Sequence, residues 1–310
     1  MDRILALRAR AVDHLLKDAW LRCIPATAPM ALFAVGGYGR GELFPHSDID
    51  VLVLASPDTQ QACHGAVARL FALLWDAGLP ISHSVRSAGE CTAAAAADQS
   101  VLTALIEERL IVGEPVDEGQ LIDATGPARV WPPRDFFVAK REELRIRHAR
   151  FGDTSDNLEP NIKEGPGGLR DLHTLGWMAL RTFGVRDLEA LVGLGHLGQD
   201  EAFALARERR ALGRLRYGLH RVAGRPEERL RFDYQKTLAQ RLGFADDAEN
   251  LGVEKMMQGF YRSAAIVRRI SDRLLQRFEE QFDGEALPEP LGDGFALRRL
   301  RSGLAGAAEV

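Results

Sequence analysis

Short apolar runs alternate with longer amphipathic segments over the first third of the chain. Residues 31–35 and 49–55 are short and apolar, and the second run is rich in β-branched side chains, so each predicts a buried strand. Residues 79–86 predict a third strand. Apolar side chains recur at helical spacing over 4–21 and again after Ser56 and Pro57, and helices are also predicted across 91–111. The pattern predicts a small α/β domain.

The rest of the chain shows helical periodicity alone. Four long segments carry it, at 134–151, 171–184, 200–224 and 253–278. A stretch rich in glycine, proline and acidic residues separates them from the α/β part and is typical of a connector. We therefore predict three regions. They are an α/β domain with a small mixed sheet and flanking helices (1–115), a connector (116–134) and an all-helical domain (135–310).

Composition narrows the class of protein. The net charge of -4 favours neither nucleic acid nor an anionic membrane as a partner. No CxxC spacing occurs among the three cysteines, which fits a reducing, cytoplasmic setting without a zinc cluster or disulfide framework. No apolar stretch approaches the ~20 residues that span a membrane. The basic run 207–232 has interspersed acids and few aromatics, so we interpret it as a solvated helix face, one that could line a nucleotide cleft.

The chemistry concentrates in AVGGYGRGELFPHSDIDVLVL, residues 34–54. Its glycines follow a strand, but both common glycine-rich patterns fail at Glu42. The dinucleotide fingerprint needs a third glycine there, and the P-loop needs a lysine. Asp48 and Asp50 offer a different interpretation, because residues two apart on a strand project to the same face. Paired carboxylates of this kind, with substrate phosphates, suit Mg²⁺. Gly36 and Gly37 would let backbone N–H groups approach those phosphates.

A second glycine-rich stretch, EPNIKEGPGGLRDLHTLGW, spans residues 159–177. It could be an ordinary turn between domains with surface charges. Together with the first stretch, it predicts a loop that closes over the nucleotide. Lys163 and Arg170 would supply cations, and Glu164 and Asp171 would order them or help to hold metal. The N–H groups expected to face phosphate belong to Gly165, Gly167 and Gly168.

These stretches identify the chain as similar to a known family. GGYGRGELFPHSDID resembles the signature of the DNA polymerase β-like nucleotidyltransferases, and more narrowly the bacterial PII-protein uridylyltransferase/uridylyl-removing enzymes. KEGPGGLRD, GLPISHSVRS and FDYQKTLAQRLG also resemble that family. The resemblance implies Mg²⁺-dependent transfer of UMP from UTP to a tyrosine of the PII signalling protein. It implies that Asp48 and Asp50 bind the metal and take part in catalysis. The nucleotide-binding residues that it implies are Gly36, Gly37, Arg40, Ser47, Lys163, Gly165, Gly167, Gly168 and Arg170.

The motifs leave alternatives for the metal ligands and for the reaction. Related enzymes commonly carry a third carboxylate on the strand after the intervening helix, but residues 81–86 read ISHSVR. That ligand is then absent, replaced by water, or supplied from elsewhere, for example by Asp98. Another nucleotide or acceptor would also suit these motifs, and so would an idle nucleotide-binding regulatory module. Family members continue into a uridylyl-removing HD domain and two ACT domains, which we expect this chain to lack.

Overall fold

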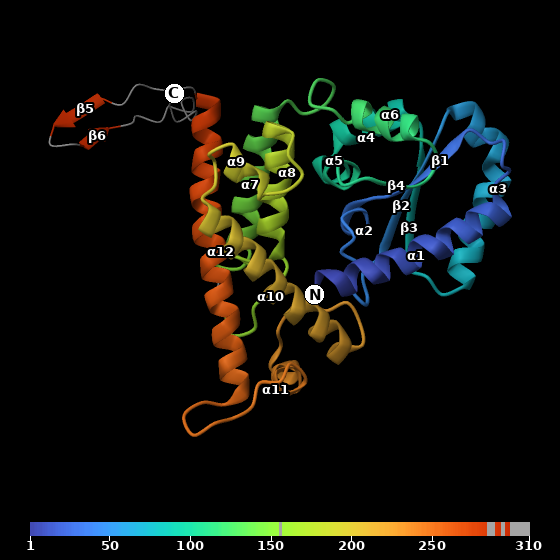
Figure 1. Ribbon diagram of the computed structural model, residues 1–310. Coiled ribbons are helices and arrows are strands. Elements are labelled where there is room, and N and C mark those ends of the chain that lie inside the picture. The colour runs from blue at the N-terminus through green and yellow to red at the C-terminus, as the bar shows by residue number, and fades with distance from the viewer. Residues whose placement is uncertain (155–156, 284–288, 293–294, 298–310) are drawn as a thin grey trace, which may run out of the picture.

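A computed structural model of the chain describes residues 1–154, 157–283, 289–292 and 295–297. Its first part is built on a four-stranded sheet in the order β3-β2-β1-β4 (Figure 1). β1 pairs antiparallel with β2 and with β4, whereas β2 and β3 run parallel. The predicted small mixed sheet is therefore confirmed. The strands are β1 (Met30–Ala34), β2 (Ile49–Ala55), β3 (Ile81–Arg86) and β4 (Arg109–Val112).

The two faces of this sheet belong to different cores. Alternate residues of β1 divide between them, with Leu32 in one cluster and Phe33 in the other, as strand geometry requires. The face that carries Leu32 packs against α1 (Asp2–Cys23) and α3 (Pro57–Asp76). The face that carries Phe33 packs against α4 (Ala88–Ala97) and α5 (Gln99–Leu105), and this core continues without interruption into the helical part.

Two elements differ from the sequence analysis. The end of the predicted helical stretch, residues 109–111, instead belongs to β4, because pairing along the edge of β1 outweighs the local helical pattern. In addition, α6 (Pro115–Ala124) begins within the α/β region and continues into the segment predicted as a connector. Pro115 occupies its first turn and Asp117 closes a capping box with Glu114. Leu121 is buried, so this helix is part of the folded core.

The remaining part is helical, which confirms its predicted class. α12 is the longest helix and packs against α8, α10 and α11 (Figure 1). A short antiparallel pair, β5 (Glu289–Gly292) with β6 (Phe295–Leu297), follows and was not predicted. No described helix is both long and apolar enough to cross a membrane. The helices are α7 (Pro133–Ala149), α8 (Leu169–Phe183), α9 (Ala190–Gly193), α10 (Gln199–Ala223), α11 (Phe232–Arg241) and α12 (Gly252–Asp283).

One close backbone contact holds the glycine turn after β1 in place. This turn is the single helical turn α2 (Gly36–Gly39). A Cβ added to Gly39 would lie only 1.8 Å from the carbonyl oxygen of Glu107, just before β4. Because both partners are backbone, neither side can yield by rotating a side chain. Gly39 is therefore required for packing the turn against the sheet edge.

We expect Gly39→Ala to destabilise the protein strongly, because the added methyl group forces α2 away from Glu107. The free energy of unfolding should fall by about 2 kcal/mol or more in urea denaturation. Gly119→Ala is the matched control, since a Cβ there meets nothing within 4 Å and lies in α6. It should be neutral or slightly stabilising. Equal stability of the two variants would contradict this account of the turn.

Candidate active site

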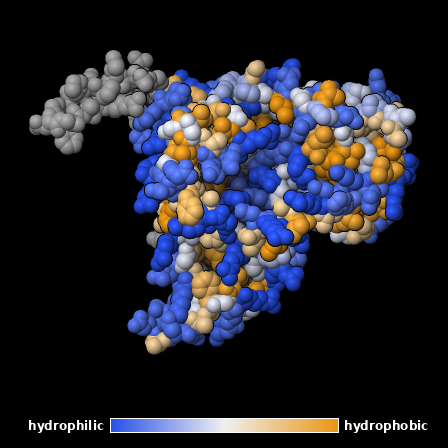
Figure 2. Space-filling model, viewed as in Figure 1, coloured by the Kyte–Doolittle hydropathy of each residue, from blue (hydrophilic) through white to orange (hydrophobic). Residues whose placement is uncertain are grey.

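A cavity of about 440 Å³ lies between the sheet and the helical part. Figure 2 shows a hollowed, hydrophilic surface between the two parts of the molecule. Both glycine-rich stretches contribute to the cavity walls. From the first stretch come Gly36, Gly37, Arg40, Ser47, Asp48 and Asp50, and from the second come Lys163 and Arg170. The structure therefore brings together eight of the eleven site residues that the sequence predicted. We call this cavity the cleft.

The carboxylate pair lies at the start of β2. Asp48 immediately precedes the strand and is exposed, whereas Asp50 is its second residue and is half-buried. Burial raises the pKa of Asp50, and the neighbouring Asp48 raises it further. A hydrogen bond with Ser82 and the charge of Lys163 oppose this rise. The ionised pair is thus electrostatically costly, which is the arrangement that a bound cation relieves.

A third carboxylate does not complete this pair among the described residues. No group of three or more histidine, cysteine, aspartate or glutamate side chains in them could hold a metal ion. Ser82 of β3 occupies the position directly beside Asp50 in the parallel register. Asp98, one of the alternatives, instead caps α5 by accepting a hydrogen bond from Ser100 N at 2.7 Å. The oxygen ligands gathered here are therefore two carboxylates.

The α2 turn faces the carboxylates directly. A Cβ added to Gly36 would stand 3.5 Å from an oxygen of Asp50, so only the bare backbone separates the turn from the carboxylate. Gly36 and Gly37 are the first residues of α2, and their N–H groups have no partner within that helix. Arg40 follows, but its guanidinium is engaged twice. Nε donates to Glu42 and Nη1 donates to Glu107.

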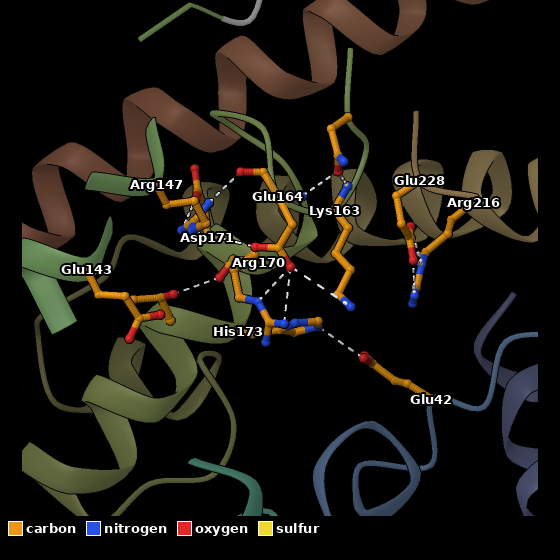
Figure 3. A network of polar contacts seen from close by, with 12 residues as sticks. Glu42, Glu143, Arg147, Lys163, Glu164, Arg170, Asp171, His173, Arg216 and Glu228 are labelled. Carbon is orange, nitrogen blue, oxygen red and sulfur yellow. Dashed lines mark hydrogen bonds and ion pairs between the residues drawn. The ribbon is translucent and has the colours of Figure 1, made fainter. Parts of the chain in front are cut away.

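Lys163 and Arg170 enter the cleft from the helical part (Figure 3). The nearest carboxylate to the Lys163 ammonium is Glu164, at 3.9 Å, which is too long for a hydrogen bond. Arg170 donates to the same carboxylate and lies 5.3 Å above the ring of Trp177. Burial lowers the pKa of Lys163, and the charges of Arg216 and Arg170 lower it further. Lys163, Arg170 and Arg216 therefore lie near one another on this wall of the cleft. The carboxylates beside them are Glu164 and Glu228.

The three glycines between these cations do not act as predicted. The sequence predicted that Gly165, Gly167 and Gly168 offer N–H groups to phosphate. In the structure, each of these N–H groups already donates a hydrogen bond within the protein. They donate respectively to the carbonyl of Asn161, to a carboxylate oxygen of Asp171 and to the carbonyl of Gly165. None of the three lines the cleft. Their small size matters instead, because a Cβ at any of them would meet backbone within 2.7 Å.

Asp171 anchors this loop from beneath rather than holding metal. Its side chain is 1% exposed and faces the helical core. It accepts hydrogen bonds from Arg147 at 2.8 Å and from His148 Nε2 at 3.0 Å, in addition to Gly167 N. Burial would raise the pKa of Asp171, but the contacts with His148 and Arg147 outweigh it and lower this pKa. The alternative that Asp171 helps to hold metal is therefore wrong.

A polar seam that the sequence analysis did not predict joins the two parts. Glu42 accepts from His173 and Arg40, and Glu107 accepts from Arg40 and from the indole N–H of Trp177. Burial, together with the charge of Arg40, lowers the pKa of His173 to about 3, so this imidazole is neutral and donates through Nε2. These five residues also border a second cavity, of about 560 Å³, on the other side of the seam.

Further residues of the cleft were also missed. Lys140 and Glu143 come from α7, whereas Arg216 and His220 come from α10 and Glu228 from the segment after it. Arg216, His220 and Glu228 lie within the basic run 207–232, which was interpreted as a solvated helix face that could line a nucleotide cleft. In the structure, Arg216 and His220 are buried. No motif spacing marks any of the three, and the signal present in the sequence was the run of arginines.

We expect Asp171→Asn to lower the free energy of unfolding by about 3–5 kcal/mol, because it leaves the buried Arg147 without its charge partner. Chemical denaturation measures this loss. The lowered pKa means that the contribution of Asp171 is complete above about pH 4 and is lost as the pH falls further. Asp200→Asn, at an exposed position in α10, is the control and should change stability little. A surface-like response at Asp171 would contradict the anchor.

Asp50→Asn should have the opposite effect on stability when no metal is present. Because the folded state raises the pKa of Asp50, its ionised form costs stability at neutral pH, and the amide removes that cost. Scanning calorimetry in a chelator should give a higher melting temperature for the variant at pH 7. The difference should disappear at about pH 3, where the carboxyl is protonated in both states. A lower melting temperature for the variant at pH 7 would refute this.

Comparisons with known proteins agree with this geometry. Residues 25–112 match the family described as a nucleotidyltransferase domain, and residues 135–275 match the GlnD PII-uridylyltransferase family. A bifunctional uridylyltransferase/uridylyl-removing enzyme of Xanthomonas axonopodis pv. citri is 73% identical over 96% of this chain. Its counterpart in Pseudomonas fluorescens is 42% identical over 95% of the chain.

The shared region is only part of those relatives. It covers 34% of the Xanthomonas protein and 33% of the Pseudomonas protein, so this chain spans about a third of their length. The match includes the sheet with Asp48 and Asp50 as well as the helices with Lys163 and Arg170. Through both of its parts, the chain is therefore similar to the bacterial PII-uridylyltransferases.

Proposed function

We propose that this chain transfers UMP from UTP to a tyrosine hydroxyl of a PII signalling protein and releases pyrophosphate. One observation carries the proposal: Asp48 and Asp50 of the sheet share a cleft with Lys163 and Arg170 of the helical part. Acidic ligands on one wall and cations on the other suit a metal–triphosphate substrate. The names of the relatives support a uridylyl group as the group transferred, and the family described as PII-uridylyltransferase supports PII as the acceptor.

The donor set of the cleft fits Mg²⁺. Asp48 and Asp50 provide carboxylate oxygens, and Mg²⁺ completes its coordination with substrate phosphates and water rather than with a full protein cage. Burial and the neighbouring Asp48 raise the pKa of Asp50, and a cation bound between the two carboxylates would oppose that rise. When bound, the metal would polarise the α-phosphate and help to ionise the attacking hydroxyl.

The protein's own groups then have distinct tasks. The tyrosine oxygen attacks the α-phosphorus while the bond to the bridging oxygen breaks, and that oxygen leaves with pyrophosphate. The tyrosine proton passes to one of the two carboxylates, Asp48 or Asp50. Negative charge grows on the leaving group, where Lys163 and Arg170 stabilise it. Gly36 and Gly37 let the triphosphate lie against the backbone.

Labelled UTP tests this proposal directly. Wild-type protein with Mg²⁺ should label purified PII, and Asp48→Asn and Asp50→Asn should each lower the rate by about a hundredfold or more, because each loses a metal-binding charge. Asp76→Asn, at the exposed end of α3, is the control and should retain activity. Labelling from ATP but not from UTP would replace UTP as the donor. Inactivity with every nucleoside triphosphate, or full activity of both variants, would refute nucleotidyl transfer through this pair.

A further inference from the structure

One end of the cleft is built from groups outside both sequence motifs. Arg216 of α10 lies with its guanidinium 4.1 Å from the centre of the Phe44 ring, and its side chain is 10% exposed. Glu228 accepts from its Nε at 2.8 Å and from Nη2, which fixes the plane of the guanidinium. Nη1 makes no hydrogen bond or ion pair within the described residues. A rigid cation thus presents an unused donor edge at the cleft wall.

His220, one helical turn further along α10, adds an independent indication of a ligand. Its side chain is fully buried and lines the cleft, yet neither ring nitrogen has a hydrogen-bond partner within the described residues. The nearest carboxylate oxygen, from Glu228, stands 3.7 Å from Nε2. A buried polar group without a partner costs stability unless something else satisfies it. A ring N–H of His220 is therefore free to donate to an acceptor that enters this end of the cleft.

Lys163 is structurally joined to the same end. Ile162 N donates to the carbonyl of Glu228, and Leu230 N donates to the carbonyl of Pro160, each at 2.8 Å. The loop that carries Lys163 and the segment that carries Glu228 are therefore paired along their backbones. The Lys163 ammonium, the Arg216 guanidinium and the His220 ring are held as one unit. Of the three, only Arg216 already has a carboxylate at hydrogen-bond distance.

The opposite end of the cleft has a different character. Figure 3 shows Glu143 and Arg216 on opposite sides, with Arg170 and Lys163 between them. The ammonium of Lys140 there is already paired with Glu143, at 2.5 Å, and lies 5.1 Å from the centre of the Trp177 ring. This end offers a carboxylate, hydroxyl groups and an aromatic ring, and its one lysine is already paired. Such groups suit a ribose and a base better than a polyphosphate.

We propose that Lys163, Arg216 and His220 bind the β- and γ-phosphates, so that the nucleoside extends toward Glu143 and Lys140. The inference rests on the proposed function, because it assigns the direction in which UTP lies across the carboxylates. Arg216 and His220 thereby become ligands of the leaving pyrophosphate, which keeps the bridging oxygen when the α-phosphorus bond breaks. Their N–H groups donate to its oxygens as charge develops there.

Binding of the two halves of the substrate tests this orientation. Calorimetry with Mg²⁺ would measure the affinity of inorganic pyrophosphate and of UMP for wild-type protein, Arg216→Gln and Glu143→Gln. Arg216→Gln should weaken pyrophosphate about tenfold or more and leave UMP within about twofold, because it removes charge-assisted donors. Glu143→Gln should do the reverse. Arg214→Gln is the matched control, since Arg214 lies on the exposed side of α10 and bonds the Leu242 carbonyl.

The binding results distinguish failure of the orientation from failure of the proposed function. The reversed pattern, or pyrophosphate binding unchanged in Arg216→Gln, overturns the orientation while wild-type transfer from UTP would still support the proposed function. Wild-type protein that binds neither ligand nor UTP overturns both. Thermal melts identify misfolded variants, and Arg216→Lys provides a milder substitution. It keeps the charge but loses the planar fork, so it should weaken pyrophosphate less than Arg216→Gln does and spare UMP. Loss of UMP binding alone in Arg216→Lys would also overturn the orientation.

Discussion

The cleft depends on one half-buried carboxylate at the seam between the two parts of the molecule. Glu42 accepts from Arg40 at 3.0 Å, from His173 at 3.1 Å and from Arg209 at 3.1 Å, so it joins the sheet's first loop to two helices. Burial would raise the pKa of Glu42, but the charges of Arg40 and Arg209 and the hydrogen bond from His173 outweigh it and keep this pKa low. This charge therefore helps to fix the separation between the carboxylates and the cations of the cleft.

The seam therefore explains why a residue that breaks two common motifs is important here. Glu42 excludes both a dinucleotide fingerprint and a P-loop. In the structure, the same side chain fastens the glycine turn to α8 and α10. The family resemblance assigns Arg40 to the nucleotide. In the structure, two of its guanidinium nitrogens donate hydrogen bonds to Glu42 and Glu107 of this seam. Any contribution of Arg40 to nucleotide binding would therefore include keeping the turn in place.

The sequence predicted features that depend on local periodicity, and it missed features that depend on distant packing. Alternation along a strand places Asp48 and Asp50 together whatever surrounds them, so this pair could be predicted. Arg216 and Glu228 meet the Lys163 loop only after α10 folds back, which no local pattern encodes. The three inner glycines of the second motif show a further limit. A glycine that exposes its N–H and one that admits a close backbone, as Gly167 does beside Ala264, look identical in a sequence.

The contact between Gly167 and α12 also has a consequence for the order in which the protein matures during synthesis. A chain emerging from a ribosome completes the four strands once residue 112 is free, because β4 is the last of them. The loop that carries Lys163 rests on the backbone of Ala264, which is synthesised long after residue 112. A nascent chain could thus hold a finished sheet and both carboxylates well before it has a cleft. Nucleotide binding should therefore begin only after α12 has left the exit tunnel.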